Sequence, residues 1–331
     1  MDELRPKLII VTGAGSSEPY GFPLGKKLKG EIIKLCEKAN YNDGLPSCDE
    51  NHINLPFCKE PRELKEFAKK LSKCRHDSID ACCFEIKDAN FSETAKVLIG
   101  YVLLNYTKKF INTHQHERDW LRKFFSLITE FGKEGELKQG SLLFLTFNYD
   151  CVIEYEIEKE VKYFIQAGRN DLVDFFKSIK VEHVYGKLED DIPSDGGLTK
   201  LKNYSKGLKL MKDGTAKSIS QETLEAYFEE AIVIYFLGFA FHELNLEFID
   251  LKNILKKCTN WKIMSRTSLG MDATTIDIYK SGKILKGNWQ IFPDEDCLSL
   301  IGNEIRKNEI KNPVSGRDPF SIFPPLDTSI S

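Results

Sequence analysis

The sequence lacks the paired cysteines that a structural zinc site normally contributes. It has nine cysteines, an odd number, and no two of them form a Cys-x-x-Cys arrangement. Structural zinc sites bring their ligands in such closely spaced pairs. Cys82 and Cys83 are adjacent and would point in different directions on a helix. We therefore expect no cysteine-based metal site, and we expect the thiols to be reduced.

Long apolar runs are also absent. A membrane-spanning helix needs about 20 predominantly apolar residues, and no run in this chain approaches that length. The first apolar stretch, residues 8–13, is too short for the core of a secretory signal peptide. These observations predict a cytoplasmic protein that makes no direct contact with a membrane.

The chain carries little excess charge of either sign. Its formal net charge is -3, although 29% of its 331 residues are charged. A protein with a dedicated nucleic-acid surface is normally clearly basic, so we expect no direct binding of nucleic acid. The hydrophobic fraction of 41% is enough for one sizeable core at this length.

Strand-like and helix-like patterns alternate along most of the chain. Short apolar runs predict strands at 7–12, 141–147, 180–185, 231–237 and 261–266. Apolar residues at helical spacing predict helices at 24–39, 61–74, 92–105, 120–128, 150–160, 222–230 and 244–257. Because strands that alternate with helices favour parallel pairing, we predict an α/β fold with a Rossmann-like, doubly wound parallel sheet.

Three segments stand apart from this alternation. Residues from about 40 to 135 contain helical patterns without a strand, which indicates a helical insertion within a domain spanning 1–311. Residues 41–59 and 189–220 have no periodicity and are predicted to be loops. Residues 312–331 contain four prolines and are predicted to be an irregular tail that wraps the surface or contacts a partner.

The first binding signal follows the first predicted strand. Thr12 precedes Gly-Ala-Gly-Ser-Ser at 13–17. Glycines at this position let a backbone approach a phosphate, although such a turn also occurs simply where a strand reverses into a helix. A dinucleotide fingerprint needs a third glycine where this chain has Glu18, and residues 21–26 are one residue short of a Walker A loop. The pattern therefore disfavours ordinary dehydrogenases and P-loop enzymes.

Polar residues follow other predicted strands. Asn148 and Asp150 come directly after 141–147, and His183 lies near the end of 180–185. Ligands of open α/β sheets bind outside the carboxyl ends of the strands. Asp150 suits a helix N-cap equally well, and a histidine on a strand is often a core residue, although its titration near neutral pH also suits a base.

Taken in order, four strand-end motifs resemble the sirtuin-like NAD-binding domain family. They are GAGSS at 13–17, TFNYD at 146–150, HVYG at 183–186 and LGFAFHELN at 237–245. The likeness is nearest to the bacterial antiphage-defence branch of NADase effectors. It spans residues 8 to about 250, so the tail and the helical block lie outside the motifs.

The resemblance assigns a role to each motif. Asn148 would contact the nicotinamide ribose and position the attacking water, and His183 would act as the base on water or a ribose hydroxyl. The glycine loop would hold the pyrophosphate and ribose of NAD, Asp150 would shape the nicotinamide pocket, and the glycine after the fourth strand would line the adenosine side. The NAD-binding residues that it implies are Thr12, Gly13, Ala14, Gly15, Ser16, Ser17, Asp150, Gly238 and Phe239.

Departures from the family narrow the implied activity. The four-cysteine zinc module of deacetylating sirtuins is absent, Phe147 stands where their motif has glutamine, and an acidic run at 189–191 replaces an acetyl-lysine channel motif. His242 stands where defence relatives often have aspartate, and His242 beside Glu243 would be splayed by helical geometry, so we expect no metal.

These departures favour NAD glycohydrolysis to nicotinamide and ADP-ribose by a triggered antiphage effector that depletes NAD. Two alternatives stay open: a non-catalytic module that senses NAD or ADP-ribose, and an NAD-dependent protein deacylase or ADP-ribosyltransferase. The family further implies a homo-oligomer and an activating partner, such as a separately encoded ATPase of HerA type or an Argonaute-like protein. The chain has no ATPase motif of its own, and the helical block and the tail are the expected contact surfaces.

Overall fold

The sheet at the centre of the molecule is parallel throughout. The computed structural model describes residues 8–38, 40–42, 45–47, 61–86, 88–113, 119–131, 139–193, 198–210, 219–231, 233–251, 253–254, 263–267, 289–292, 297–299 and 301. Its six strands lie in the order β5-β4-β1-β6-β7-β8, and each neighbouring pair is parallel. They are β1 (Leu8–Thr12), β4 (Leu142–Thr146), β5 (Lys180–His183), β6 (Val233–Leu237), β7 (Ile263–Thr267) and β8 (Trp289–Phe292). The predicted α/β class with a parallel sheet is confirmed.

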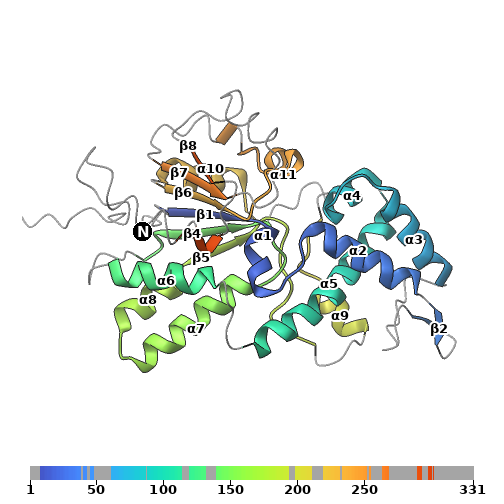
Figure 1. Ribbon diagram of the computed structural model, residues 1–331, viewed down its shortest axis with the longest axis horizontal. Helices are drawn as coiled ribbons and strands as arrows, with labels where there is room; N and C mark the ends of the chain where they lie inside the picture. The colour runs from blue at the N-terminus through green and yellow to red at the C-terminus, as the bar shows by residue number, and fades with distance from the viewer. Residues whose placement is uncertain are drawn as a thin grey trace, which may run out of the picture.

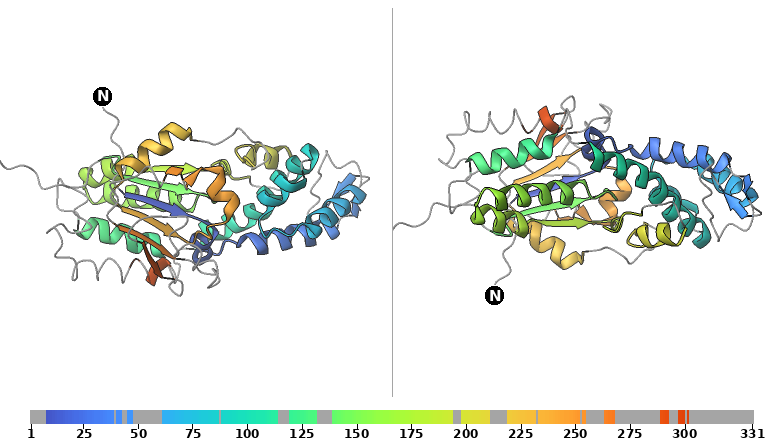
Figure 2. Two further views of the ribbon diagram at one scale, coloured as in Figure 1. Left: turned by 90° about the horizontal axis from the view of Figure 1, so that it is seen from above. Right: turned by 90° about the horizontal axis from the view of Figure 1, so that it is seen from below.

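Helices cover both faces of this sheet and bury its central strands. Every residue of β1 and β4 is buried, as expected for parallel strands packed between helices. Helix α6 (Trp120–Phe131) and helix α10 (Gln221–Glu230) lie on opposite faces, which both views in Figure 2 show. Helices α7 (Val152–Gln166) and α8 (Asn170–Ser178) connect β4 to β5 and pack against each other.

A group of helices lies beyond the carboxyl ends of the strands (Figure 1). It comprises α2 (Gly25–Glu37), α3 (Pro61–Lys73), α4 (Ile79–Ile86), α5 (Ala89–Asn112) and α9 (Leu198–Tyr204). We call this group the helical lobe. The short helices α1 (Ala14–Ser17) and η1 (Glu18–Tyr20) lead from β1 into it, and α11 (Glu243–Phe248) follows β6. Consequently, the edge of the sheet where ligands are expected faces the lobe.

Most predicted elements are present, with shifted ends. All five predicted strands are found, and the helices predicted at 24–39, 61–74, 120–128 and 222–230 match α2, α3, α6 and α10. Helix α5 begins at Ala89 rather than at residue 92, because the Asp88 side chain accepts hydrogen bonds from the N–H groups of Asn90 and Phe91. Helix α7 continues to Gln166, past the predicted end at 160.

Other predictions need correction. The turn predicted at Gly13 to Gly15 is a single helical turn, α1. Residues 41–59, predicted to be a loop, include parts of an antiparallel pair formed by β2 (Asn40–Asn42) and β3 (Leu45–Ser47). The loop predicted at 189–220 contains α9. Of the helix predicted at 244–257, α11 ends at Phe248, Leu251, Asn253 and Ile254 are again helical, and residues 252 and 255–257 lie outside the described residues. Elements α4, α8 and β8 were not predicted. The tail at 312–331 lies outside the described residues.

Within the residues that the structure describes, no helix combines the length and the apolar character that a membrane crossing requires.

Candidate active site at the carboxyl ends of the central strands

The register of the sheet aligns the ends of four strands. Thr12 pairs with Thr146 on one side and with Leu237 on the other, and Thr146 pairs with His183. Parallel strands in this register end in one row. The segments that follow β1, β4 and β6 therefore emerge next to one another and next to His183, although their residues are far apart in the sequence.

Asn148 is the hub of a buried hydrogen-bond network. Its amide nitrogen Nδ2 donates to the Gly13 carbonyl oxygen at 3.1 Å and to the Ser17 hydroxyl at 2.8 Å, and it lies 3.3 Å from the Ser16 hydroxyl. Only the NH2 end of the amide can pair with a carbonyl oxygen, so the orientation of the side chain is fixed. Its bonds thus link the glycine loop after β1 to the segment after β4.

Asp150 extends this network and also supports the start of α7. Its Oδ1 accepts from the Ser17 hydroxyl at 3.1 Å and from the Val152 N–H at 3.3 Å. Asp150 is not the N-cap of α7, which is Cys151, but it accepts from the first N–H of that helix and also belongs to the network. Burial raises the pKa of Asp150 to about 6, against the lowering effect of these hydrogen bonds and of His183.

His183 is held at both ring nitrogens. Its Nδ1 lies 2.9 Å from the Asn148 carbonyl oxygen, and its Nε2 lies 2.8 Å from Oε1 of Glu154. Because a carbonyl oxygen only accepts, Nδ1 carries a proton. Burial on its own lowers the pKa of His183, but the hydrogen bond and charge of Glu154 outweigh it, and the pKa is raised. In this arrangement Nε2 is not available to a substrate.

Glu154 was missed in the sequence. It lies in the first turn of α7, and no local pattern marks it as a partner of His183, which is distant in the sequence. Burial would raise the pKa of Glu154, but His183 and then Lys187 lower it. The Lys187 ammonium lies 3.3 Å from the same Oε1, whereas Oε2 is buried and has no hydrogen-bond partner within the part of the chain that the structure describes.

Thr12 presents a second buried polar atom of this kind. Its side chain is fully buried at the end of β1, and Oγ1 has no hydrogen-bond partner among the described residues. Buried polar groups are normally paired, by protein or by water. Two such atoms, Oγ1 of Thr12 and Oε2 of Glu154, therefore belong to residues at this end of the sheet.

The glycines of the first motif are required by close backbone packing. A Cβ on Gly13 would lie 2.7 Å from the Gly238 carbonyl oxygen, and a Cβ on Gly15 would lie 2.9 Å from the Gly238 Cα. The N–H groups of Gly13 and Gly15 donate to Leu237 and Gly238, and that of Ser16 donates to Gly13. These three N–H groups are already used inside the protein, and the contact of the loop with pyrophosphate stays a prediction.

Phe239 belongs to an aromatic cluster beneath the site. Its ring centroid lies 4.8 Å from that of Phe147, 5.0 Å from that of Phe241 and 5.9 Å from that of Phe236. Phe147 also contacts Tyr185 at 5.6 Å. Phe147 thus packs in the core, and Phe239, predicted to line the adenosine side, is only 1% exposed.

Two buried hydrogen bonds join neighbouring helices to the site, one from α6 and one from α4 of the helical lobe. The Trp120 indole Nε1 donates to the Ser16 carbonyl oxygen at 2.7 Å. The Tyr149 hydroxyl donates to Oδ1 of Asp80 on α4, and burial raises the pKa of Asp80 to about 6. Neither Tyr149 nor Asp80 was singled out in the sequence, because nothing local indicates that α4 reaches the end of β4.

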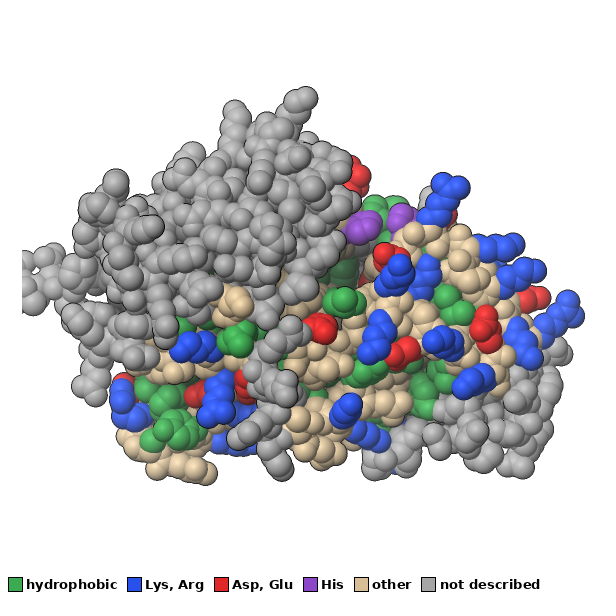
Figure 3. All heavy atoms as spheres, in the orientation of Figure 1, with side chains coloured by type: hydrophobic (Ala, Val, Ile, Leu, Met, Phe, Trp, Pro, Cys, Tyr) green, Lys and Arg blue, Asp and Glu red, His purple; other side chains and the backbone are tan. Residues whose placement is uncertain are grey.

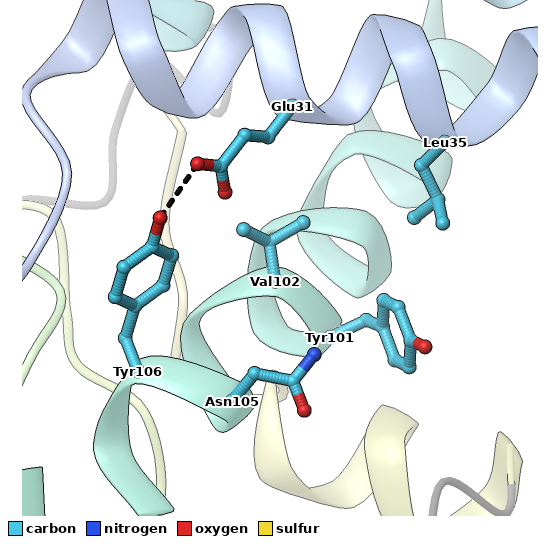
Figure 4. Close-up of a pocket in the computed structure, with 6 residues that line it drawn as sticks. All are labelled: Glu31, Leu35, Tyr101, Val102, Asn105 and Tyr106. Carbon is cyan, nitrogen blue, oxygen red and sulfur yellow. Dashed lines mark hydrogen bonds between the residues drawn. The ribbon is translucent and has the colours of Figure 1, made fainter. Parts of the chain in front are cut away.

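A separate cavity lies in the lobe, between α2 and α5. Its volume is about 350 Å³, and none of the network residues lines it. Figure 4 shows the Tyr106 hydroxyl pointing toward the Glu31 carboxylate on the neighbouring helix, to which it donates at 2.6 Å. Asn105 and Val102, from the same helix as Tyr106, line the cavity below them.

The described residues contain no group of three or more histidine, cysteine or acidic side chains that could hold a metal ion. His242, considered as a metal ligand with Glu243, is exposed and lies beside His76, with 6.2 Å between ring centroids. On the face drawn in Figure 3, lysine and arginine side chains of the lobe are interspersed with acidic ones. Basic side chains are more numerous than acidic ones on this face of the lobe (Figure 3).

Comparison with known proteins does not assign the chain to a family: no family model matches it, and no curated protein shows significant similarity.

Proposed function

We propose that the protein is an NAD glycohydrolase whose site is centred on Asn148 and His183. The observation that carries the proposal is the Asn148 network: the residues to which the sirtuin-like motifs assign chemistry come from separate strand ends and form one connected set. The proposal includes a Rossmann-like, doubly wound sheet, with the substrate at the carboxyl ends of its strands.

The reaction does not need a strong acid to protonate the leaving group. The bond between C1′ of the ribose and the pyridinium nitrogen breaks, and its electron pair passes to nicotinamide, which leaves as a neutral molecule. Water adds to C1′ and gives up a proton, so the products are nicotinamide, ADP-ribose and one proton. Fixed dipoles and orientation of the water supply most of the stabilisation in such a reaction.

The chain offers residues for these tasks. The Asn148 amide is held rigidly by three neighbours, so its position is set before a substrate arrives. Asp150 borders the same network and would shape the nicotinamide pocket. His183 would accept the proton of the water, which requires Nε2 to separate from Glu154. Thr12, residues 13–17, Gly238 and Phe239 would hold the remainder of NAD.

The test is release of nicotinamide and ADP-ribose from NAD, followed by chromatography. We expect Asn148→Ala and His183→Ala to lower the rate at least about 100-fold, the usual size of a general-base or positioned-dipole contribution. Asn203→Ala is the matched control, because it removes the same amide from an exposed position on α9, and it should leave the rate unchanged. Turnover that survives in both site variants would refute the proposed site.

A second function is favoured by one observation. Both ring nitrogens of His183 are engaged, which suits a non-catalytic module that senses NAD or ADP-ribose. Calorimetry with NAD separates the two. Binding without turnover, with and without partners, would establish the sensor, whereas turnover would exclude it.

The motifs carry further proposals about assembly and biological role. In this proposal the protein is a cytoplasmic antiphage effector that depletes NAD when triggered. It forms a homo-oligomer and acts with a separately encoded ATPase of HerA type or another activating protein. The engaged state of His183 is consistent with an enzyme that stays inactive until such a trigger arrives, since unchecked hydrolysis of NAD would be toxic to the cell.

A further inference from the structure

The buried pair formed by Glu154 and His183 has no role in the motifs that suggested NAD hydrolysis. Glu154 comes from α7 and His183 from the end of β5. His183 is 5% exposed and the Glu154 side chain is 27% exposed, so water screens the pair weakly. The pair lies directly behind the Asn148 backbone, because the same imidazole contacts the Asn148 carbonyl oxygen.

We propose that Glu154 is a positioning residue, which occupies Nε2 of His183 and keeps the imidazole against the Asn148 carbonyl oxygen. His183 becomes a base when the Glu154 carboxylate moves toward Lys187 and leaves Nε2 free. Only the second part, in which His183 acts as a base, rests on the proposed NAD hydrolysis. The positioning part concerns two side chains of the chain and is measured without NAD.

The first step of the argument is the position of the protons. Nδ1 of His183 must donate, since it faces a carbonyl oxygen. Nε2 faces Oε1 of Glu154 at 2.8 Å, and an ionised carboxylate is also only an acceptor. Both contacts are satisfied together when the imidazole carries two protons. A doubly protonated imidazole has no lone pair and cannot accept a proton from water.

The second step is the alternative partner of Glu154. The Lys187 ammonium already lies 3.3 Å from Oε1 and also pairs with Asp190 at 2.9 Å. When His183 loses its Nε2 proton, the carboxylate faces a lone pair and is repelled. A small displacement toward Lys187 then keeps Glu154 paired and exposes Nε2, while Nδ1 stays on the Asn148 carbonyl oxygen.

Other titratable groups of the described residues also face the pair. Asp150 faces His183 and raises its pKa, and Glu182 is its neighbour on β5. Among the described residues, Asp150 and the half-buried Cys151 thiol also face Glu154, and burial raises the pKa of Cys151. None of these groups is hydrogen-bonded to Nε2 of His183. A change in the His183 pKa on substitution of Glu154 can therefore be attributed to Glu154.

The test is nitrogen-15 NMR of the full-length protein labelled in its histidine rings, titrated without NAD. We expect Glu154→Gln to lower the pKa of His183 by about one unit or more, the usual effect of losing an adjacent opposite charge. Glu158→Gln is the matched control, because Glu158 lies one turn further along α7 and pairs with Lys162 on the surface; it should leave that pKa unchanged. Glu154→Asp should keep most of the elevation.

Lys187→Gln should change the pKa of His183 in the opposite direction. Without its alternative partner, Glu154 stays on His183, and the pKa of His183 should rise. In the NAD assay, the acid limb of the kcat/KM profile should move to lower pH in Glu154→Gln and to higher pH in Lys187→Gln. An unchanged His183 pKa in a folded Glu154→Gln or Lys187→Gln variant would overturn the proposal. A shifted pKa with no NAD turnover in any form would instead overturn the proposed function while upholding the positioning role.

Discussion

At the scale of single residues, the site depends on ionisable groups that are buried at a cost. Asp150 has a pKa of about 6 in the folded protein because burial disfavours its charge, against 3.8 for an ordinary aspartate. Between these two values the folded chain holds a proton that the unfolded chain has released. The free energy of unfolding therefore decreases as the pH rises through this window, and the penalty is complete above about pH 6.

Asp150→Asn should remove this penalty. Its amide oxygen can still accept from Ser17 and Val152, while no charge is buried. We expect the free energy of unfolding at pH 7.5 to increase by up to about 3 kcal/mol, from roughly two units of pKa shift at 1.36 kcal/mol each, with little increase near pH 4. Urea denaturation at both pH values measures this.

Asp171→Asn is the control for that change, because Asp171 lies on the surface beside Arg169 and should alter stability by less than about 0.5 kcal/mol. An equal gain for Asp150→Asn at both pH values would show that burial of its charge is not the cause.

At the scale of elements, the turns after β1 and β6 pack backbone against backbone, and glycines make this close contact possible. Gly238 has φ +57, and a Cβ added there would lie 2.1 Å from the Ser16 backbone nitrogen. Gly168, at the end of α7, has φ +70, and a Cβ there would meet nothing within 4 Å. The two positions share the left-handed conformation and differ in the space around them.

This pair permits a matched test. Gly168→Ala should cost about 1–2 kcal/mol of stability, the conformational cost alone. Gly238→Ala should cost about 2–5 kcal/mol, because overpacking against backbone adds to it. Chemical denaturation of both variants gives the comparison. Equal losses would mean that the loop after β1 yields easily, and that its contact with Gly238 does not define the site.

At the scale of the whole molecule, the helical lobe is coupled to the sheet at the site. The Tyr149 hydroxyl bonds Asp80 of α4, and the Asp80 carboxylate otherwise has the Ser78 hydroxyl as its side-chain partner among the described residues. Since the bond from Tyr149 lowers the pKa of Asp80 while burial raises it, loss of the hydroxyl makes the Asp80 charge harder to bury.

Tyr149→Phe should therefore lower the free energy of unfolding at pH 7.5 by about 1–3 kcal/mol, the cost of an unsatisfied buried group. The loss should shrink at pH 5, where Asp80 is largely protonated. Tyr163→Phe serves as the control because Tyr163 is 62% exposed. A double-mutant cycle with Asp80→Asn measures the coupling itself, and a coupling energy near zero would contradict this account of how the lobe is attached.

The sequence by itself determined five of the six strands of the main sheet, their alternation with helices and the places where these strands end. Those features are local: an apolar run followed by glycine, asparagine or aspartate predicts a buried strand and a turn regardless of the remainder of the chain. The rule that ligands bind at carboxyl ends then groups Asn148, Asp150 and His183 from the sequence alone.

Only the tertiary structure decided how those ends meet. The register that sets Thr146 beside His183, the contact of Gly238 with the glycine loop and the capping of His183 by Glu154 all join residues distant in sequence. Such contacts depend on the packing of α7 and of the lobe against the sheet, for which a sequence pattern carries no local signal. For the same reason, the engaged state of His183 emerged from geometry, whereas its presence at a strand end was predictable.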